Sequence, residues 1–359
     1  MEDARRHYLD QIRYDGVALS PALAAAFAAV PREVFVPDGF HRRDGRLVLP
    51  ADPEFLPTVY SNDVLVTKMN GDVPISSSSQ PSLMAVMIEA LDVRPGHRVL
   101  EIGAGTGYNA ALMATLGAEV TTVDVQEDVA DRARAALARA GIDGVRVEHA
   151  DGYTGGVDGR YDRIIVTVGV AGVSPHWLDR LEPGGLIVAP VEHAGTHPVL
   201  VVRPDPVTAS VVCPAGFMTA AGPLASRHQH SHPPPAPALG GLAETAPARW
   251  GTALEAYAYR DLWYAAGAWH NRATHASIPG REQSFLALLD DSGAAGAVVL
   301  PDGAILASGG SAERYTAVAT ALVDRWWSLG RPPIRAWRVG LALDGPILAP
   351  RTWALTKLR

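Results

Sequence analysis

The sequence predicts an α/β protein in which a doubly wound, Rossmann-like domain with a parallel sheet is followed by a smaller α+β domain. Short apolar strands alternate with amphipathic helices over residues 88–202, and a glycine-rich turn leads from one of these strands into a helix. The segment after residue 221 is rich in proline and glycine, which is typical of an extended linker. We therefore expect three segments: a first domain at residues 1–221, a linker at 222–248 and an accessory domain at 249–359.

Short apolar runs predict the strands of the first domain, and apolar residues three or four apart predict its helices. Ala130, Ala133 and Leu137, for example, share one helix face. A turn at residues 183–185 is expected to lead into the last strand. The expected strands cover residues 98–102, 119–125, 145–149, 161–168 and 186–190. The expected helices cover residues 85–91, 108–116 and 127–140.

The accessory domain shows a mixture of both patterns. Two helices are expected at residues 250–269 and 312–329. The expected strands cover residues 285–289, 297–300, 304–307 and 334–343, with a hairpin turn at 301–303. Seven of the eight tryptophans lie in this segment. Core packing is the simpler explanation for them, and recognition of a peptide substrate is the functional one.

Composition limits the classes of partner. The chain has 359 residues, 31 Lys+Arg against 38 Asp+Glu, and no block of basic residues, so we expect no nucleic-acid partner. No apolar run is long enough for a membrane span, and the charged N-terminus shows no secretory signal, so we expect a cytoplasmic protein without a membrane partner. A single cysteine excludes a disulfide framework. His228, His230 and His232 alternate in the linker, where a solvated loop is favoured over a metal site, and we expect no metal.

The sharpest motif lies at the end of the first expected strand. Gly103, Gly105 and Gly107 precede a helix, so the bare backbone and the helix N-terminal N–H groups are open to a ligand. A dinucleotide fingerprint needs its third glycine at position 108, which is Tyr108, so an NAD-dependent oxidoreductase is disfavoured. Glu101 places a carboxylate where a pyrophosphate would be repelled and a cationic amino-acid group would be held.

Two aspartates follow the next two strands. Asp124, with Val125, ends the second strand, where an acidic side chain accepts hydrogen bonds from ribose hydroxyls. Asp151 and Gly152 follow the third strand, at the height of an adenine amino group. Each aspartate alone is explained equally well as a helix cap or a solvated loop residue. With Glu101 and the glycines, they form the pattern of cofactor-binding residues in S-adenosyl-L-methionine-dependent methyltransferases.

Three segments ahead of the glycine motif resemble the protein-L-isoaspartate (D-aspartate) O-methyltransferase family. They are VPREVFVP at 30–37, YSND at 60–63 and PISSSSQPSLM at 74–84. The resemblance runs over residues 8–220. It implies a class I methyltransferase fold, S-adenosyl-L-methionine as the cofactor, and transfer of the methyl group to a peptide carboxylate.

The family carries a serine at the methyl acceptor, and the serine run here is longer than the usual pattern. Counting from Asp63 puts this serine at Ser76, whereas counting back from Glu101 puts it at Ser79. We favour Ser79 as the catalytic residue, because the match then continues into the following helix, and we keep Ser76 as the alternative. The resemblance implies that the pocket around it binds the substrate through Asp63, Ser77, Ser78 and Gln80.

The serine run and the C-terminal extension also resemble a subgroup of the family that tailors ribosomal peptides, such as lanthipeptides, graspetides and lasso peptides. This resemblance implies a modified, cyclised precursor peptide as the partner and an aspartyl ester that collapses to an aspartimide or isoaspartate. Two alternatives stay open. One is a general repair enzyme for isoaspartate in damaged proteins, and the other is a non-catalytic peptide-binding module.

Overall fold

A computed structural model describes residues 2–14, 17–156, 158–204, 206–226, 239–281 and 283–356. The chain forms two compact units that interleave along the sequence. The first consists of Met1–Val168, Ser174–Ala189 and Val201–Pro206. The second consists of Gly169–Val173, Pro190–Leu200 and Val207–Arg359. Residues 227–238 of the expected linker, with His228, His230 and His232, lie outside the described residues.

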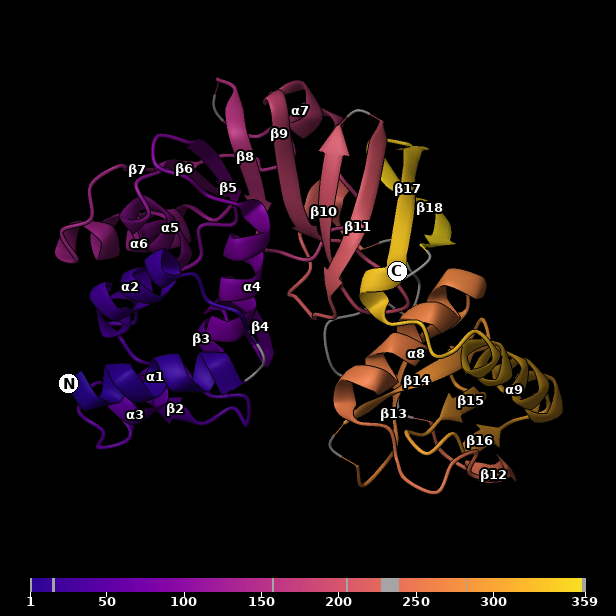
Figure 1. Ribbon diagram of the computed structural model, residues 1–359. Coiled ribbons are helices and arrows are strands. Elements are labelled where there is room, and N and C mark those ends of the chain that lie inside the picture. The colour runs from indigo at the N-terminus through magenta and orange to yellow at the C-terminus, as the bar shows by residue number, and fades with distance from the viewer. Residues whose placement is uncertain are drawn as a thin grey trace. The chain divides into compact units, whose positions relative to one another are not determined.

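A parallel sheet forms the centre of the first unit (Figure 1). Its strands run in the order β9-β8-β5-β6-β7, so the chain changes direction between β5 and β8. Ligands of such sheets bind at the carboxyl ends of the strands beside this switch point. The strands are β5 (Arg98–Ile102), β6 (Glu119–Asp124), β7 (Val145–His149), β8 (Tyr161–Val166) and β9 (Leu181–Pro190). The helices that pack on them are α4 (Pro81–Leu91), α5 (Tyr108–Thr115) and α6 (Glu127–Arg139), and α7 (Pro175–Asp179) precedes β9.

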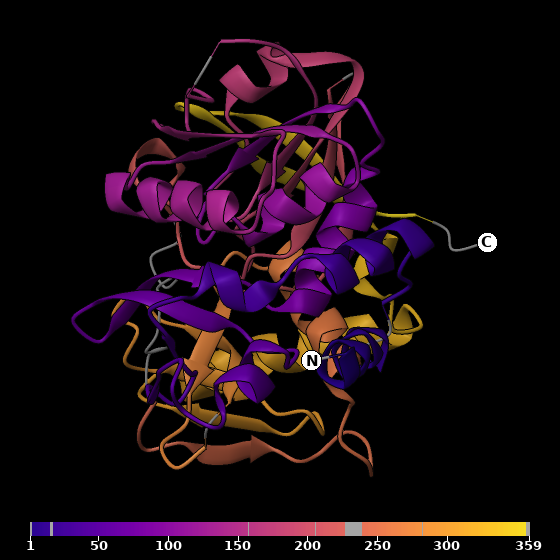
Figure 2. The same ribbon diagram turned by 90° about the vertical axis from the view of Figure 1, so that its left-hand side faces the viewer.

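The N-terminal part of this unit adds short helices and a small antiparallel sheet in the order β2-β1-β3-β4. Helix α1 begins beside the N label in Figures 1 and 2. The strands are β1 (Phe40–His41), β2 (Leu47–Val48), β3 (Leu65–Asn70) and β4 (Val73–Ser78). The helices are α1 (Glu2–Tyr14), α2 (Pro21–Ala29), the 3-10 helix η1 (Arg32–Phe35) and α3 (Phe55–Val59). Strand β4 is followed by α4, so only Gln80 separates the serine run at residues 76–79 from this helix.

The second unit contains a five-stranded antiparallel sheet in the order β12-β16-β15-β14-β13, against which two helices pack (Figure 1). Strand β17 pairs antiparallel with both β11 and β18, which brings residues 207–213 together with the C-terminal strands. The five strands are β12 (Ala243–Ala246), β13 (Ala273–Ser277), β14 (Ser284–Leu289), β15 (Gly296–Val299) and β16 (Ile305–Ser308). The remaining elements are β10 (Val199–Pro204), which the two units divide, β11 (Val207–Cys213), η2 (Gly222–Leu224), α8 (Ala256–Trp269), α9 (Ala312–Ser328), η3 (Ile334–Ala336), β17 (Trp337–Asp344) and β18 (Ile347–Leu355).

The predicted fold class, a Rossmann-like α/β domain with a further α+β domain, is confirmed. The expected turn at residues 183–185 lies inside β9 as a bulge, where the pairing with β8 passes from Leu181 to Leu186 and Gly184 has φ of +80°. A strand is expected at 334–343, but β17 begins three residues later, at Trp337, because residues 334–336 form the 3-10 helix η3. The expected segment boundaries at 221 and 248 stay a prediction. The second compact unit also takes in residues 207–221, because β11 pairs with β17.

Within the described ranges, no helix has both the length and the apolar character needed to cross a membrane. The same ranges hold no cluster of three or more His, Cys, Asp and Glu side chains arranged to bind a metal ion. The cytoplasmic location expected from the sequence stays a prediction.

Candidate active site

The glycine loop joins the central strand β5 to helix α5. Gly103, Gly105 and Gly107 have φ of +100°, +52° and +84°, in a region that residues with a Cβ rarely adopt. A Cβ on Gly103 would lie 2.6 Å from Thr167 Oγ1, and that hydroxyl donates to the Gly103 carbonyl at 2.6 Å. The loop is therefore bare backbone at the carboxyl end of the sheet, beside the switch point.

Glu101 is fully buried one residue before the end of β5. Its carboxyl oxygens accept hydrogen bonds from Asn109 Nδ2 at 2.7 Å and from Thr122 Oγ1 at 2.6 Å. Burial raises the pKa of Glu101 to about 7. Among the described residues, the buried Asn109 Oδ1 has no hydrogen-bond partner. A buried carboxyl group beside an unused acceptor fits the cationic amino-acid end of the expected cofactor.

The raised pKa of Glu101 predicts a pH-dependent stability. The native state holds a proton that the unfolded chain releases above its ordinary pKa of 4.5, so the free energy of unfolding should fall as the pH rises from 4.5 to about 7. The loss attributable to this group is at most about 3 kcal/mol. Urea unfolding of the cofactor-free wild type and Glu101→Gln, at about pH 5 and about pH 8, measures it. A shallower pH dependence in Glu101→Gln is expected, and equal slopes in the two proteins would contradict the prediction.

Asp124 lies at the end of β6 and faces the glycine loop. Its two carboxyl oxygens accept hydrogen bonds from the Gly105 backbone at 3.2 Å and from the Gln126 backbone at 3.0 Å. Burial raises the pKa of Asp124, and these backbone donors act in the opposite direction. The next residue, Val125, has an exposed fraction of 56%. Asp124 thus holds the loop in place, with Val125 beside it open to a ligand.

Asp151 and Gly152 follow β7 on the same edge of the sheet. Asp151 is exposed and accepts a hydrogen bond from the Tyr153 backbone at 2.9 Å, which closes a local turn. A Cβ on Gly152 would lie 2.6 Å from Ile102 Cγ2, so this loop packs against the end of β5. The parallel registers of β5, β6 and β7 bring the loops after all three strands together. The predicted cofactor residues therefore share one edge, and their contacts with a cofactor stay a prediction.

The serine run lies on β4 and extends one residue beyond it. Its pairing with β3 shifts register on both sides of Lys68, so bulges in this hairpin accommodate the longer sequence. A Cβ on Gly105 would lie 3.1 Å from the Ser77 carbonyl oxygen. The backbone of the β3–β4 hairpin therefore passes directly over the glycine loop.

The four serines differ in exposure. Ser76 and Ser78 are 8% and 2% exposed, whereas Ser77 and Ser79 are half-buried. The Ser78 hydroxyl accepts hydrogen bonds from Nε and Nη2 of Arg32, each at 3.4 Å. Because successive side chains of a strand alternate, Ser76 belongs to the same inward face as Ser78. This geometry favours Ser79 over Ser76 as the acceptor-binding serine, and leaves Ser78 committed to Arg32.

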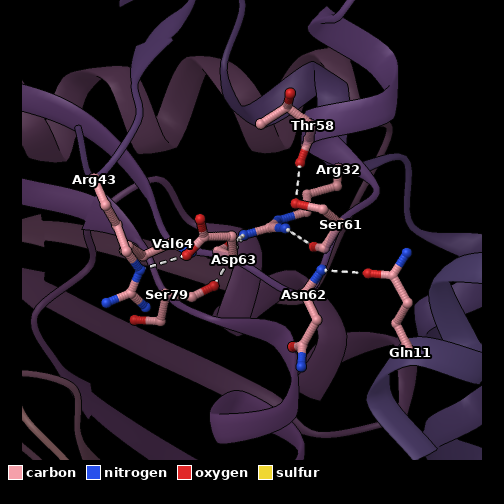
Figure 3. A network of polar contacts seen from close by, with 9 residues as sticks. All are labelled: Gln11, Arg32, Arg43, Thr58, Ser61, Asn62, Asp63, Val64 and Ser79. Atoms are coloured by element: carbon pink, nitrogen blue, oxygen red, sulfur yellow. Dashed lines mark hydrogen bonds and ion pairs between the residues drawn. The ribbon is translucent and has the colours of Figure 1, made fainter. Parts of the chain in front are cut away.

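Asp63 and Ser79 meet at the end of the hairpin (Figure 3). The carbonyl oxygens of both residues accept hydrogen bonds from Arg32 Nη2, at 3.0 Å and 2.9 Å. The Asp63 carboxylate accepts from Arg43 Nε at 2.6 Å and from its neighbour's backbone N–H. Gln80 follows directly as the residue that caps α4. Asp63, Ser78 and Ser79 are thus gathered around one buried arginine.

Lys68 links the β3–β4 hairpin to the edge of the parallel sheet that carries the predicted cofactor residues, which we call the cofactor edge. Its Nζ donates to Gln126 Oε1 at 2.8 Å and to Asp128 Oδ1 at 2.6 Å, and Gln126 Nε2 donates to the Ile75 carbonyl at 3.4 Å.

We expect Lys68→Met to speed the release of S-adenosylhomocysteine, the expected cofactor without its methyl group. The rate should rise by up to about fivefold, which corresponds to the free energy of a half-exposed ion pair. Stopped-flow displacement measures this rate. Arg146→Met, which removes an exposed ion pair with Glu148, serves as the control, and equal rates in both variants would contradict the prediction.

Several residues of this site were not predicted from the sequence, among them Arg32, Lys68, Asn109 and Gln126. Arg32 lies within the quoted segment 30–37, and a charged residue in an apolar run was the available signal. Asn109 and Gln126 gave no comparable signal, because their partners Glu101 and Lys68 are defined only by the folded chain.

Comparison with protein families supplies the observation that decides the assignment. The model for the family described as Protein-L-isoaspartate(D-aspartate) O-methyltransferase matches residues 3–211, which is more than half of the chain. The chain belongs to this family. Its cofactor is S-adenosylmethionine, and the chain is an enzyme of the methyltransferase class. Family membership therefore disfavours both the NAD-dependent and the non-catalytic alternatives.

Two sequence relatives cover about half of the chain, and one solved structure extends the match beyond the family model. The Protein-L-isoaspartate O-methyltransferase of Methanoculleus marisnigri is 38% identical over 185 residues, covering 50% of this chain and 73% of that protein. The protein of the same name from Thermotoga maritima is 37% identical over 177 residues, covering 48% and 51%. A solved structure named protein-L-isoaspartate O-methyltransferase aligns with a TM-score of 0.56 and 26% identity over 97% of this chain and 99% of that chain. The C-terminal unit therefore has a counterpart in that methyltransferase.

Proposed function

We propose that this enzyme transfers the methyl group of S-adenosylmethionine to the free carboxylate of isoaspartyl residues in peptides and proteins, as a general repair enzyme. The single observation that carries the proposal is the position of the β3–β4 hairpin. Its backbone lies over the glycine loop, where a Cβ on Gly105 would be 3.1 Å from the Ser77 carbonyl, and its end presents Ser79. An acceptor held at this end would face the cofactor edge of the sheet.

The methyl transfer does not require the protein to remove a proton from the acceptor. A carboxylate with an ordinary pKa of ~3.9 is ionised at neutral pH, so it attacks without a general base. When bound, S-adenosylmethionine supplies an electrophilic methyl group. The protein's own task is to hold the acceptor carboxylate in line and to exclude water, for which Ser79 offers a hydroxyl donor. Glu101, the glycine loop and Asp124 would hold the cofactor.

The product ester explains how methylation leads to repair. Its methoxy group is a better leaving group than the carboxylate oxygen it replaces. The backbone nitrogen of the next residue attacks the ester carbonyl, methanol leaves, and a five-membered succinimide closes. Water then opens this ring at either carbonyl, and one of the two openings restores a normal aspartyl bond.

Tailoring of a cyclised precursor peptide is the finer alternative. Its sequence argument used the serine run and the C-terminal extension. A protein-L-isoaspartate O-methyltransferase of known structure aligns with nearly the whole chain, extension included, so the extension does not distinguish a tailoring enzyme. The comparisons fit the repair function better, and a role of the C-terminal domain in substrate recognition stays a proposal under either function.

Mass spectrometry of two matched linear peptides tests the proposal. One peptide carries a single isoaspartate, and the other carries aspartate at the same position. With S-adenosylmethionine, the isoaspartyl peptide should gain the mass of one methylene group and then lose methanol, while the aspartyl peptide stays unchanged. Methylation confined to normal aspartate in a cyclised peptide would overturn the repair proposal in favour of tailoring. Absence of cofactor binding in calorimetry would overturn both.

A further inference from the structure

Arg32 is a fully buried cation in the first unit. In the described part of the chain, the hydrogen bonds of its guanidinium go to backbone carbonyls and to the Ser78 hydroxyl rather than to a carboxylate. Burying a charge is costly unless its donors are satisfied, and the guanidinium presents five N–H donors in a fixed plane. A cation in this position therefore fixes the places of the carbonyls that surround it.

Those carbonyls belong to two segments that are distant in sequence. Nη1 donates to the carbonyls of Val59 and Ser61, at 2.8 Å and 3.2 Å. Nη2 donates to Asp63 at 3.0 Å and to Ser79 at 2.9 Å (Figure 3). Nη2 thus sets the separation between Ser79 and the loop at residues 60–64 between α3 and β3, which we call the Asp63 loop.

The same guanidinium is also tied to the glycine loop. Its Cζ lies 6.0 Å from the ring centroid of Tyr8 and 5.8 Å from that of Tyr108, within range of a cation–π attraction. Tyr108 is the first residue of α5, directly after Gly107. The hydroxyl groups of the two tyrosines are 3.3 Å apart. Arg32 therefore contacts both the acceptor side and the cofactor side of the site.

We propose that Arg32 is a positioning residue of the methyl transfer, which holds Ser79 and the Asp63 loop at a fixed place relative to the glycine loop. With no exposed surface, Arg32 acts on the substrate through these segments and not by contact. The inference rests on the proposed function. A displacement of about 1 Å between reacting groups can cost on the order of 100-fold in rate, so the position of these carbonyls matters for turnover.

Two substitutions separate positioning from packing. Arg32→Lys keeps a positive charge with fewer donors, and Arg32→Met keeps an unbranched side chain with none. We expect kcat for the isoaspartyl peptide to fall at least about tenfold in Arg32→Lys and on the order of 100-fold in Arg32→Met. Cofactor affinity from calorimetry should stay within about twofold. Arg163→Lys is the matched control, because Arg163 is also largely buried and donates to the Leu91 carbonyl at 2.7 Å.

A second readout does not depend on activity. Hydrogen exchange should become faster at residues 59–64 and 77–80 in both Arg32 variants, and stay unchanged at residues 98–102 and 119–124. If the wild type fails to methylate isoaspartyl peptides, the proposed function falls while the exchange result still tests Arg32. Three results would overturn the proposal. Folded Arg32→Met could have the kcat and the hydrogen exchange of the wild type, or the Arg32 variants could lose no more kcat than Arg163→Lys does. Failure of both Arg32 variants to fold is the third.

Discussion

Ser79→Ala is expected to lower kcat/KM for an isoaspartyl peptide on the order of 100-fold, the scale of loss when a reacting group is displaced by about 1 Å. Ser79 is half-buried at the end of β4, and its backbone is already held by Arg32 through the carbonyl. Removing the hydroxyl therefore leaves the loop in place. Cofactor affinity should remain within about twofold, measured by calorimetry in parallel with steady-state kinetics.

Ser76→Ala supplies the matched control and settles the register of the serine run. Ser76 is 8% exposed and lies opposite Lys68 in the β3–β4 pairing, on the inward face of the strand. Its substitution should change kcat/KM by less than about threefold. If Ser76→Ala is the more damaging of the two, the acceptor serine is Ser76, and the preference for Ser79 is wrong.

The parallel sheet was predictable because its strands carry local signals. The strands at 98–102 and 145–149 begin and end where the sequence places them, since apolar runs bounded by charged and glycine residues allow few other boundaries. The short strands β1 and β2 have two residues each, and no periodicity can announce a strand of that length. They exist through pairing, β2 with β1 and β1 with β3.

The candidate site was predictable where residue type alone indicates chemistry. Glycines, Glu101, Asp124 and the serine run belong to this class. The role of Arg32 was not predictable, because its acceptors are backbone carbonyls, which every residue carries. For the same reason, Ser78 and Ser79 look equivalent in the sequence, and only the fold turns one toward Arg32 and leaves the other half-exposed.

Gly103→Ala is expected to have the largest effect on cofactor binding. Gly103 has φ of +100°, and an added Cβ would lie 2.6 Å from Thr167 Oγ1 and 3.1 Å from Val168 Cγ1. Backbone strain of this kind costs about 1–3 kcal/mol, and relief of the close contacts requires the loop to move away from residues 167–168, which follow β8. Because the loop backbone is the expected contact surface, affinity for S-adenosylmethionine should fall on the order of 100-fold in calorimetric titration.

Gly216→Ala is the matched control, because a Cβ there meets no atom within 4 Å among the described residues and its φ is not positive. It should bind the cofactor as the wild type does. Urea unfolding of both variants separates a distorted loop from a destabilised chain, since Gly103→Ala should lose more in cofactor affinity than in the free energy of unfolding. Binding by Gly103→Ala within about twofold of the wild type would mean that the cofactor does not lie against this loop.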